Sequence, residues 1–103
     1  MDKLDRLKAV LESKIKKTRN DINNELHNKA YNDSLQNEIR TLEWVLEYIG
    51  KNAQTDDDNN LEVAIENKIA ELAIRMDKAT HREVTDFLFT KLETLRWVLY
   101  VIH

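Results

Sequence analysis

Few residues in this chain could perform chemistry, and they are three histidines, two serines and one run of aspartates. They are His27, His81, His103, Ser13, Ser34, Asp56, Asp57 and Asp58. A helical di-metal centre needs inward glutamates with Glu-x-x-His spacing, and that spacing does not occur. Neither serine has a histidine at a local motif spacing, and the single glycine, Gly50, rules out a phosphate-binding loop. We therefore predict no enzyme activity, no metal site and no cofactor.

The aspartate run at 56–58 admits a second interpretation, a weak cation site. An EF-hand loop would also need its glycine and its terminal glutamate, which this segment lacks. The acids instead precede an expected helix, where the positive end of the helix dipole stabilises negative charge. A solvated linker is the better interpretation.

The composition is typical of long helices joined by few turns. The 103 residues include one glycine and no proline, and 34% are charged. Alternating β-branched segments are absent, so we predict no strand. The chain has no cysteine, begins without an apolar signal core, and has no apolar run long enough to cross a bilayer. These features favour a cytoplasmic protein without a membrane segment.

Four stretches carry apolar residues at three- and four-residue steps, the spacing of one helical face. The expected faces are Leu4, Leu7, Leu11, Ile15, Thr18, Ile22 and Leu26; Leu35, Ile39, Leu42, Leu46 and Ile49; Leu61, Ile65, Ile69, Leu72 and Met76; and Val84, Leu88, Leu92, Leu95, Leu99 and Ile102. We expect the first helix to run to about residue 30, with a turn over residues 28–33. Expected caps are Asp33 or Ser34 and Thr80 at helix starts, each with a glutamine or glutamate completing a capping box, and Gly50 at a helix end.

The chain contains an internal duplication. Residues 41–49 and 94–102 are identical at six of nine positions, at an offset of 53 residues. The first and third apolar faces also match, at an offset of 54. Two hairpins that cannot bury their faces alone would pack together with pseudo-twofold symmetry. We predict a single all-α domain, an antiparallel four-helix bundle with hairpin repeats at 1–50 and 61–103 and a linker at 51–60.

Several large apolar residues fall outside the expected faces. Trp44 and Tyr48 lie about 200–240° around the helix from Leu42, nearly opposite the face. Trp97 and Val101 fall in the same sector of the fourth helix, with Phe89 and Tyr100 nearby. These six residues are the candidate partner-binding residues. Three explanations stay open: a wide core stripe, burial in a homodimer through the second hairpin, or a surface for another protein.

Charge is distributed unevenly and suggests one alternative function. Residues 1–19 carry seven basic and three acidic side chains, whereas residues 20–66 carry three basic and eleven acidic ones. Lys3, Arg6, Lys14 and Lys17 share one sector of the first helix and would contact nucleic acid if the chain binds it. The net charge of −3 opposes attraction to nucleic acid and favours docking of this face to the acidic middle. Between repeats, Arg40 and Glu43 exchange charge with Glu93 and Arg96. Two interpretations stay open: pairing across the pseudo-axis, if the second and fourth helices pack there, or two independent solvated faces.

The ending Leu42–Glu47, echoed at 95–99, resembles small helical-hairpin proteins of phages and mobile elements in Gram-positive bacteria. This resemblance implies a protein that binds and blocks host machinery, including defence systems, in the bacterial cytoplasm. The size also resembles the bacteriocin immunity proteins, which lack the duplication seen here. We therefore expect a non-enzymatic interaction protein, an inhibitor or adaptor, with nucleic-acid binding or an immunity-like bundle as alternatives.

Overall fold

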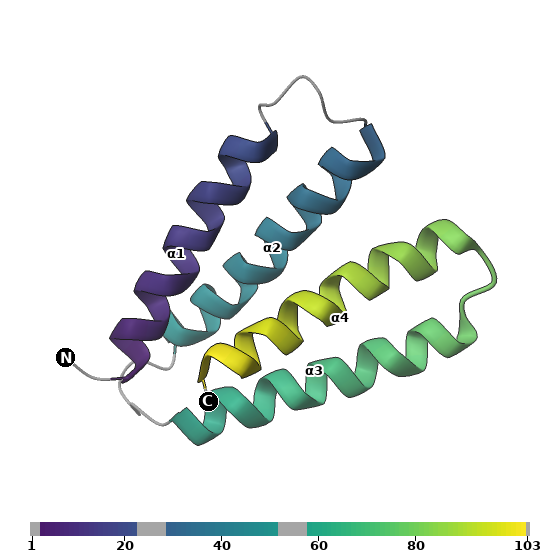
Figure 1. The fold of residues 1–103 in the computed structure, drawn as a ribbon. Helices are drawn as coiled ribbons and strands as arrows, with labels where there is room; N and C mark the ends of the chain where they lie inside the picture. The colour runs from purple at the N-terminus through teal and green to yellow at the C-terminus, as the bar shows by residue number, and fades with distance from the viewer. Residues whose placement is uncertain (1–2, 23–28, 52–57, 103) are drawn as a thin grey trace.

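The computed structural model describes residues 3–22, 29–51 and 58–102. Over these ranges the chain forms four α-helices and no strand. The helices are α1 (Lys3–Ile22), α2 (Lys29–Lys51), α3 (Asp58–Lys78) and α4 (Arg82–Ile102). Helices α1 and α2 form one antiparallel hairpin, and α3 and α4 form the other (Figure 1). The predicted all-α four-helix bundle is confirmed.

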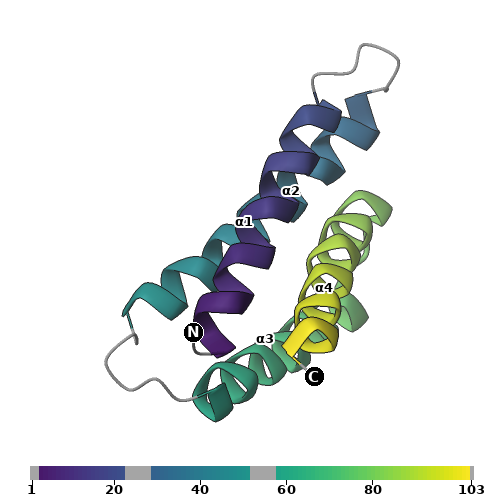
Figure 2. The same ribbon diagram turned by 60° about the vertical axis from the view of Figure 1, so that its left-hand side comes forward.

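The two hairpins meet through α2 and α4, which lie together in the middle of the molecule. Helix α1 packs mainly on α2, and α3 packs mainly on α4. Helices α2 and α4 run in the same general direction and cross at an angle (Figures 1 and 2). The central pair must therefore bury two faces each, one toward its hairpin partner and one toward the other hairpin.

The apolar faces predicted from spacing form most of the core. Leu11, Leu42, Ile65, Leu88 and Leu95 are almost completely buried, and they come from all four helices. Leu46, Ile69, Met76 and Leu99 are half-buried and pack against this core. Burial of such side chains contributes about 1.5–3 kcal/mol each, which makes this cluster the main source of stability.

A second buried stripe on each central helix explains how the hairpins join. The stripes recur at four-residue steps and are equivalent in the two repeats: Asn37, Thr41, Val45 and Ile49 on α2, and Thr90, Thr94, Val98 and Ile102 on α4. All are buried except Thr90, which is half-buried. Ridges at four-residue spacing interdigitate when helices cross at a marked angle, and small side chains let the backbones approach.

The polar members of these stripes are satisfied mostly within their own helices. The hydroxyl of Thr41 donates to the carbonyl of Asn37 (2.9 Å), and that of Thr94 donates to the carbonyl of Thr90 (2.8 Å). The Asn37 amide instead donates across the crossing to the carbonyl of Phe87 (2.8 Å). Its Oδ1 is buried without a hydrogen-bond partner among the described residues. Asn37 is therefore a polar link between the hairpins.

Several predicted helix ends were wrong. Helix α1 is described only to Ile22, and α2 begins at Lys29, so residues 29–33 are helical rather than a turn. Their side chains are mostly exposed, and a periodicity argument based on apolar residues does not detect them. Gly50 lies inside α2 and caps nothing, since the helix continues to Lys51. Helix α3 starts at Asp58, so the last three residues of the predicted linker, 58–60, are helical.

The start of α4 also differs from the prediction by one residue. The backbone carbonyl of His81 accepts the first helical hydrogen bond, from the N–H of Thr85 (3.1 Å). His81 therefore occupies the cap position predicted for Thr80. The Asp33 or Ser34 cap falls inside α2, while the expected Leu26 position lies outside the described residues.

Two further expectations about α4 and its neighbours are not met. Val84 was expected in the core, yet it is 45% exposed. It lies in the first turn of α4, one turn before Leu88, where the buried residues of that helix begin. Of the two interpretations of the exchanged charges, pairing across the axis is not the one observed among the described residues: Glu43 pairs with Arg19 (3.3 Å), and Glu93 pairs with Arg96 (3.1 Å).

No helix in the described ranges has an apolar stretch long enough to span a membrane.

Candidate interaction surface

The structure divides the six predicted partner-binding residues between two sides of the central helices. Trp97 and Val101 on α4 face the side where α1 lies, whereas Trp44 and Tyr48 on α2 lie beside α3. All four are half-buried and pack against the core. One part of each side chain therefore packs against the core, and the other part is exposed at the surface.

The first surface is a groove between α1 and α4, which we call the α1–α4 groove. It contains two hollows one helical turn apart, of about 240 and 320 Å³. Its lining residues are Leu4, Arg6, Leu7, Val10, Leu61, Val101 and Ile102 in the first hollow, and Lys14, Glu38, Phe89, Thr90, Glu93, Thr94 and Trp97 in the second. The groove exists because α1 packs on α2 and makes little contact with α4.

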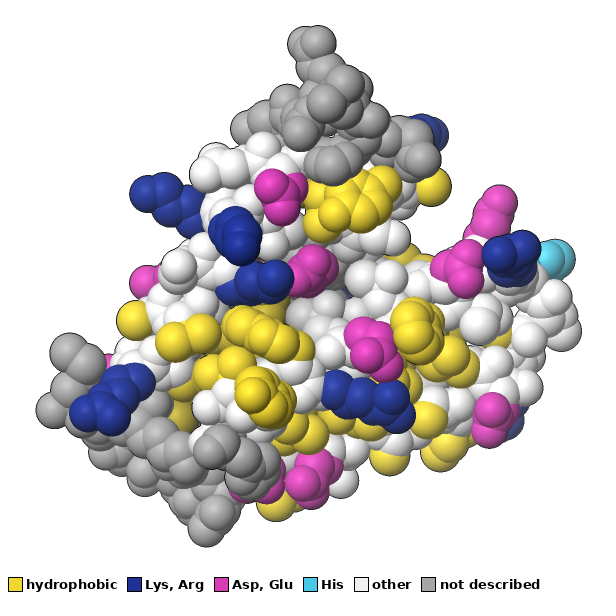
Figure 3. Space-filling model, in the orientation of Figure 1, with side chains coloured by type: hydrophobic (Ala, Val, Ile, Leu, Met, Phe, Trp, Pro, Cys, Tyr) yellow, Lys and Arg dark blue, Asp and Glu magenta, His cyan; other side chains and the backbone are white. Residues whose placement is uncertain are grey.

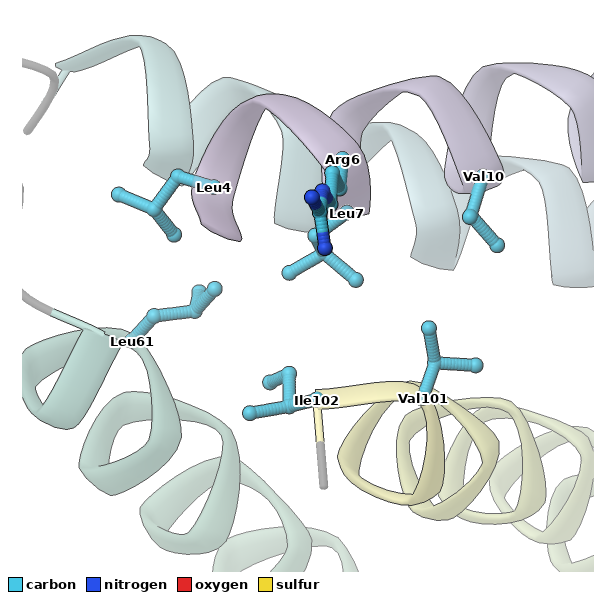
Figure 4. A pocket seen from close by; sticks show the side chains of 7 residues that line it. All are labelled: Leu4, Arg6, Leu7, Val10, Leu61, Val101 and Ile102. Atoms are coloured by element: carbon cyan, nitrogen blue, oxygen red, sulfur yellow. The ribbon is translucent and has the colours of Figure 1, made fainter. Parts of the chain in front are cut away.

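The first hollow is almost entirely apolar (Figure 4). Leu4 on α1 and Leu61 on α3 point toward one another, and Val10 points toward Val101 on α4. Arg6 is the single charged residue in this lining. Apolar surface of this kind favours a partner with apolar side chains.

Lys14 bridges the middle of the groove. Its Nζ lies 5.6 Å from the centroid of the Trp97 ring and 3.6 Å from the Oε1 of Glu38 on α2. The ring face attracts the ammonium group, and the carboxylate neutralises it. Lys14 thus connects three helices and divides the apolar hollow from the more polar one.

Two large exposed aromatic residues lie on α4, and one of them lines the groove. Phe89 is 52% exposed and lines the second hollow. Tyr100 is 80% exposed, one helical turn from Trp97. In the space-filling view, hydrophobic side chains gather over α4 and its junction with α1, with charged groups around them (Figure 3). Tyr and Trp are enriched at binding hot spots, and this face places both near an apolar hollow.

The second surface, around Trp44, is more closed. The Trp44 and Tyr48 rings lie 6.3 Å apart, and the hydroxyl of Tyr48 donates to the carbonyl of Asn60 on α3 (3.4 Å). The Nζ of Lys68 lies 5.9 Å from the centroid of the Trp44 ring. These contacts connect the aromatic pair to α3.

Of the basic residues predicted for nucleic-acid contact, Lys14 is engaged by other side chains of the protein. Lys14 is occupied by Trp97 and Glu38, and Arg6 belongs to the apolar hollow. Lys17 is exposed, and Lys3 begins α1. The docking of this face toward acidic residues is realised at Lys14.

Sequence reasoning missed the threonine and valine stripes that join the hairpins. The signal was available, because Thr41, Val45, Thr94 and Val98 recur at four-residue steps at equivalent repeat positions. Threonine is polar, so it is not counted when core positions are predicted from the spacing of apolar residues. The prediction therefore does not include these stripes.

Among the described residues, no three histidine, aspartate or glutamate side chains are grouped so as to hold a metal ion. Comparisons with protein families, curated proteins and solved structures found no match to this chain.

Proposed function

We propose that this chain is a non-enzymatic interaction module that holds an amphipathic helix of a partner protein in the α1–α4 groove. The observation that carries the proposal is the apolar hollow together with exposed Tyr100 and Phe89 on the same side of α4. Helix-in-groove recognition uses an apolar floor and a few aromatic anchors of this kind.

The dimensions of the groove suit a short helix. Its α4 side extends from Phe89 to Ile102, about 20 Å at 1.5 Å per residue. A helix of three to four turns has this length and presents three or four apolar anchors on one face. Lys14 and Glu38 would meet polar groups of that helix, which sets its register.

The resemblance to phage and mobile-element proteins leads us to propose a host protein as the partner. The chain would then act as an inhibitor or adaptor by occluding a helix that the host protein needs. A second copy of the chain is the competing occupant of the groove.

The test is selection of helical peptides from a displayed library against the full chain. Two matched variants map the binding site, Tyr100→Glu beside the groove and Val63→Glu on α3. Both place one carboxylate at an exposed apolar position, and Val63 is 53% exposed. We expect Tyr100→Glu to weaken the selected peptides at least tenfold and Val63→Glu to leave them unchanged. Trp97 is a poorer choice, since it packs on the core and its loss would confound binding with folding.

Two outcomes contradict the proposal. The first comes from the peptide selection: no peptide is enriched, or the enriched peptides still bind Tyr100→Glu and lose binding to Val63→Glu. The other is a concentration-dependent dimer, measured by light scattering after size exclusion, that Tyr100→Glu converts to monomer. That result would assign the groove to self-association.

A further inference from the structure

A hollow of about 630 Å³ lies between the N-terminal turns of α2 and α4, next to the stripes that join the hairpins. The two helices diverge toward these ends (Figure 1). The hollow is lined by residues of α2 between Lys29 and Asn37 and by residues of α4 between Glu83 and Thr90. Ligand pockets in proteins have volumes of about 300–1,000 Å³, so the hollow is large enough for a small molecule.

The internal duplication makes the two sides of this hollow equivalent. At the offset of 53 residues, Asp33 corresponds to Asp86 and Asn37 corresponds to Thr90, and all four residues belong to the lining. One side comes from the first hairpin and the other from the second, so neither hairpin forms the hollow alone. A ligand with the same chemical group at both ends suits such a site.

Negative charge predominates in the lining. It contains three carboxylates, those of Asp33, Glu83 and Asp86, and one ammonium group, that of Lys29. The carboxylate of Asp86 lies 3.9 Å from Arg82, whereas Asp33 and Glu83 form no ion pair with any described residue. The helix dipole stabilises carboxylates near an N-terminus, so charge alone does not indicate a ligand.

A buried acceptor in the lining is the second observation, and it indicates what a ligand must supply. Asn37 is 4% exposed, and its Nδ2 donates to the backbone carbonyl of Phe87 (2.8 Å). Since a carbonyl only accepts, the amide orientation is fixed, and Oδ1 is the atom left without a partner among the described residues. The hydroxyl of Thr90 donates to the carbonyl of Asp86 (3.2 Å), so its oxygen is also oriented to accept. A ligand that fills the hollow must therefore bring hydrogen-bond donors.

The donors and the charge together favour an organic ammonium group over a metal ion. Among the described residues, the acidic side chains are not grouped closely enough to hold a metal. An ammonium group carries three N–H donors and can contact acceptors that lie further apart. The Phe87 ring is 47% exposed and lines the hollow, where it offers an apolar wall to methylene groups. This ring already lies against one alkylammonium group, since the Nζ of Lys91 is 5.1 Å from its centroid.

We propose that the hollow binds a short linear diamine, a chain of methylene groups with a protonated amine at each end. One ammonium group donates to the Oδ1 of Asn37, and the other lies among the carboxylates, with the methylene chain against Phe87. Its two positive charges match Asp33 and Glu83, the two carboxylates without a described ion pair. The site shares only Thr90 with the lining of the α1–α4 groove and does not depend on the proposed function.

The test is a titration of the full chain with diaminobutane at neutral pH and fixed ionic strength, followed by the NMR signals of the backbone amides. Two probes separate the contributions: butylamine has a single ammonium group, and tetramethylammonium has the charge without an N–H donor. We expect diaminobutane to bind about threefold to fivefold more tightly than butylamine, because one exposed ion pair is lost. Tetramethylammonium should not bind at the same concentrations, and the shifts should centre on Asp33, Asn37 and Asp86.

Three variants assign the site. Asn37→Leu removes the buried acceptor and should weaken diaminobutane at least about tenfold, the value of a hydrogen bond to a charged group. Asp33→Asn removes one exposed carboxylate and should weaken it about threefold to fivefold. Glu66→Gln removes an exposed carboxylate of α3 outside the lining, so it is the matched control and should leave the affinity unchanged.

Several results would overturn the inference. Absence of binding would show that the hollow holds solvent only, and equal affinities for diaminobutane and tetramethylammonium would show general attraction of cations. Equal affinities for diaminobutane and butylamine would show that a single ammonium group suffices and that the ligand is not a diamine. Binding that survives both Asn37→Leu and Asp33→Asn, or that Glu66→Gln weakens as much as Asp33→Asn does, would place the amine elsewhere.

Discussion

Replacing Asn37 with leucine should stabilise the protein. We expect this although the Asn37 side chain on α2 donates the one hydrogen bond described between α2 and the backbone of α4. Asn37 is 4% exposed, and its Oδ1 is buried without a described partner. Loss of the bond to the Phe87 carbonyl costs about 1 kcal/mol, while an unsatisfied buried acceptor costs about 1–3 kcal/mol. The Phe87 carbonyl remains part of the helical ladder of α4.

Leucine adds apolar burial worth about 1.5–3 kcal/mol, and strain from its branched shape costs about 1–3 kcal/mol. These two terms nearly cancel, so the polar terms decide the sign. The expected net effect of Asn37→Leu is a gain of about 1 kcal/mol in the free energy of unfolding, or about 4–8 °C in the thermal midpoint.

The assay is urea unfolding followed by circular dichroism, with the slope of the transition compared between variants. Asn37→Asp is the contrasting variant, because it keeps the size, removes the donor and buries a carboxylate. It should destabilise the protein at neutral pH by more than about 2 kcal/mol. A loss of more than about 1 kcal/mol for Asn37→Leu would refute the reasoning and show that the polar link stabilises the crossing. An altered slope would show that the variant and the parent do not unfold by the same transition, so their free energies of unfolding could not be compared directly.

Two other predictions concern the core and the side chain of Lys91. Leu95 is 1% exposed, so Leu95→Ala should lower the free energy of unfolding by about 2–5 kcal/mol. Tyr100 is 80% exposed, so Tyr100→Ala should change it by no more than about 0.5 kcal/mol. Similar losses for the two variants in urea unfolding would contradict the assigned packing. The pKa of Lys91 is lowered in the folded chain, so the unfolded chain binds more protons at this group between its folded pKa and about 10.5. The free energy of unfolding of the parent protein should therefore rise relative to that of Lys91→Met as pH increases through that window. If the difference between the two thermal midpoints stayed constant with pH, the lowering of the Lys91 pKa by burial and by Lys68, Arg75 and Arg40 would be contradicted.

The sequence by itself determined the four helices, their apolar faces and the duplication. Helical periodicity is a local property, because residues three and four apart lie on one face whatever the rest of the chain does. Leu11, Leu42, Leu72 and Leu95 could therefore be placed in the core from their spacing. Helix ends such as Lys29 could not be predicted as well, because they consist of exposed residues whose pattern carries no information about packing.

Only the tertiary structure decided which helices are neighbours and what the remaining residues do. The same periodicity is compatible with several pairings, because contacts between α2 and α4 join residues about fifty positions apart. That pairing buries Thr41 and Thr94, which their polarity alone would place outside, and it exposes Val84, which its spacing would place inside. It also sends Trp44 and Trp97 to different sides of the molecule. The physical reason is that burial and charge crowding depend on the neighbours a residue receives from other helices, and spacing along one helix does not specify them.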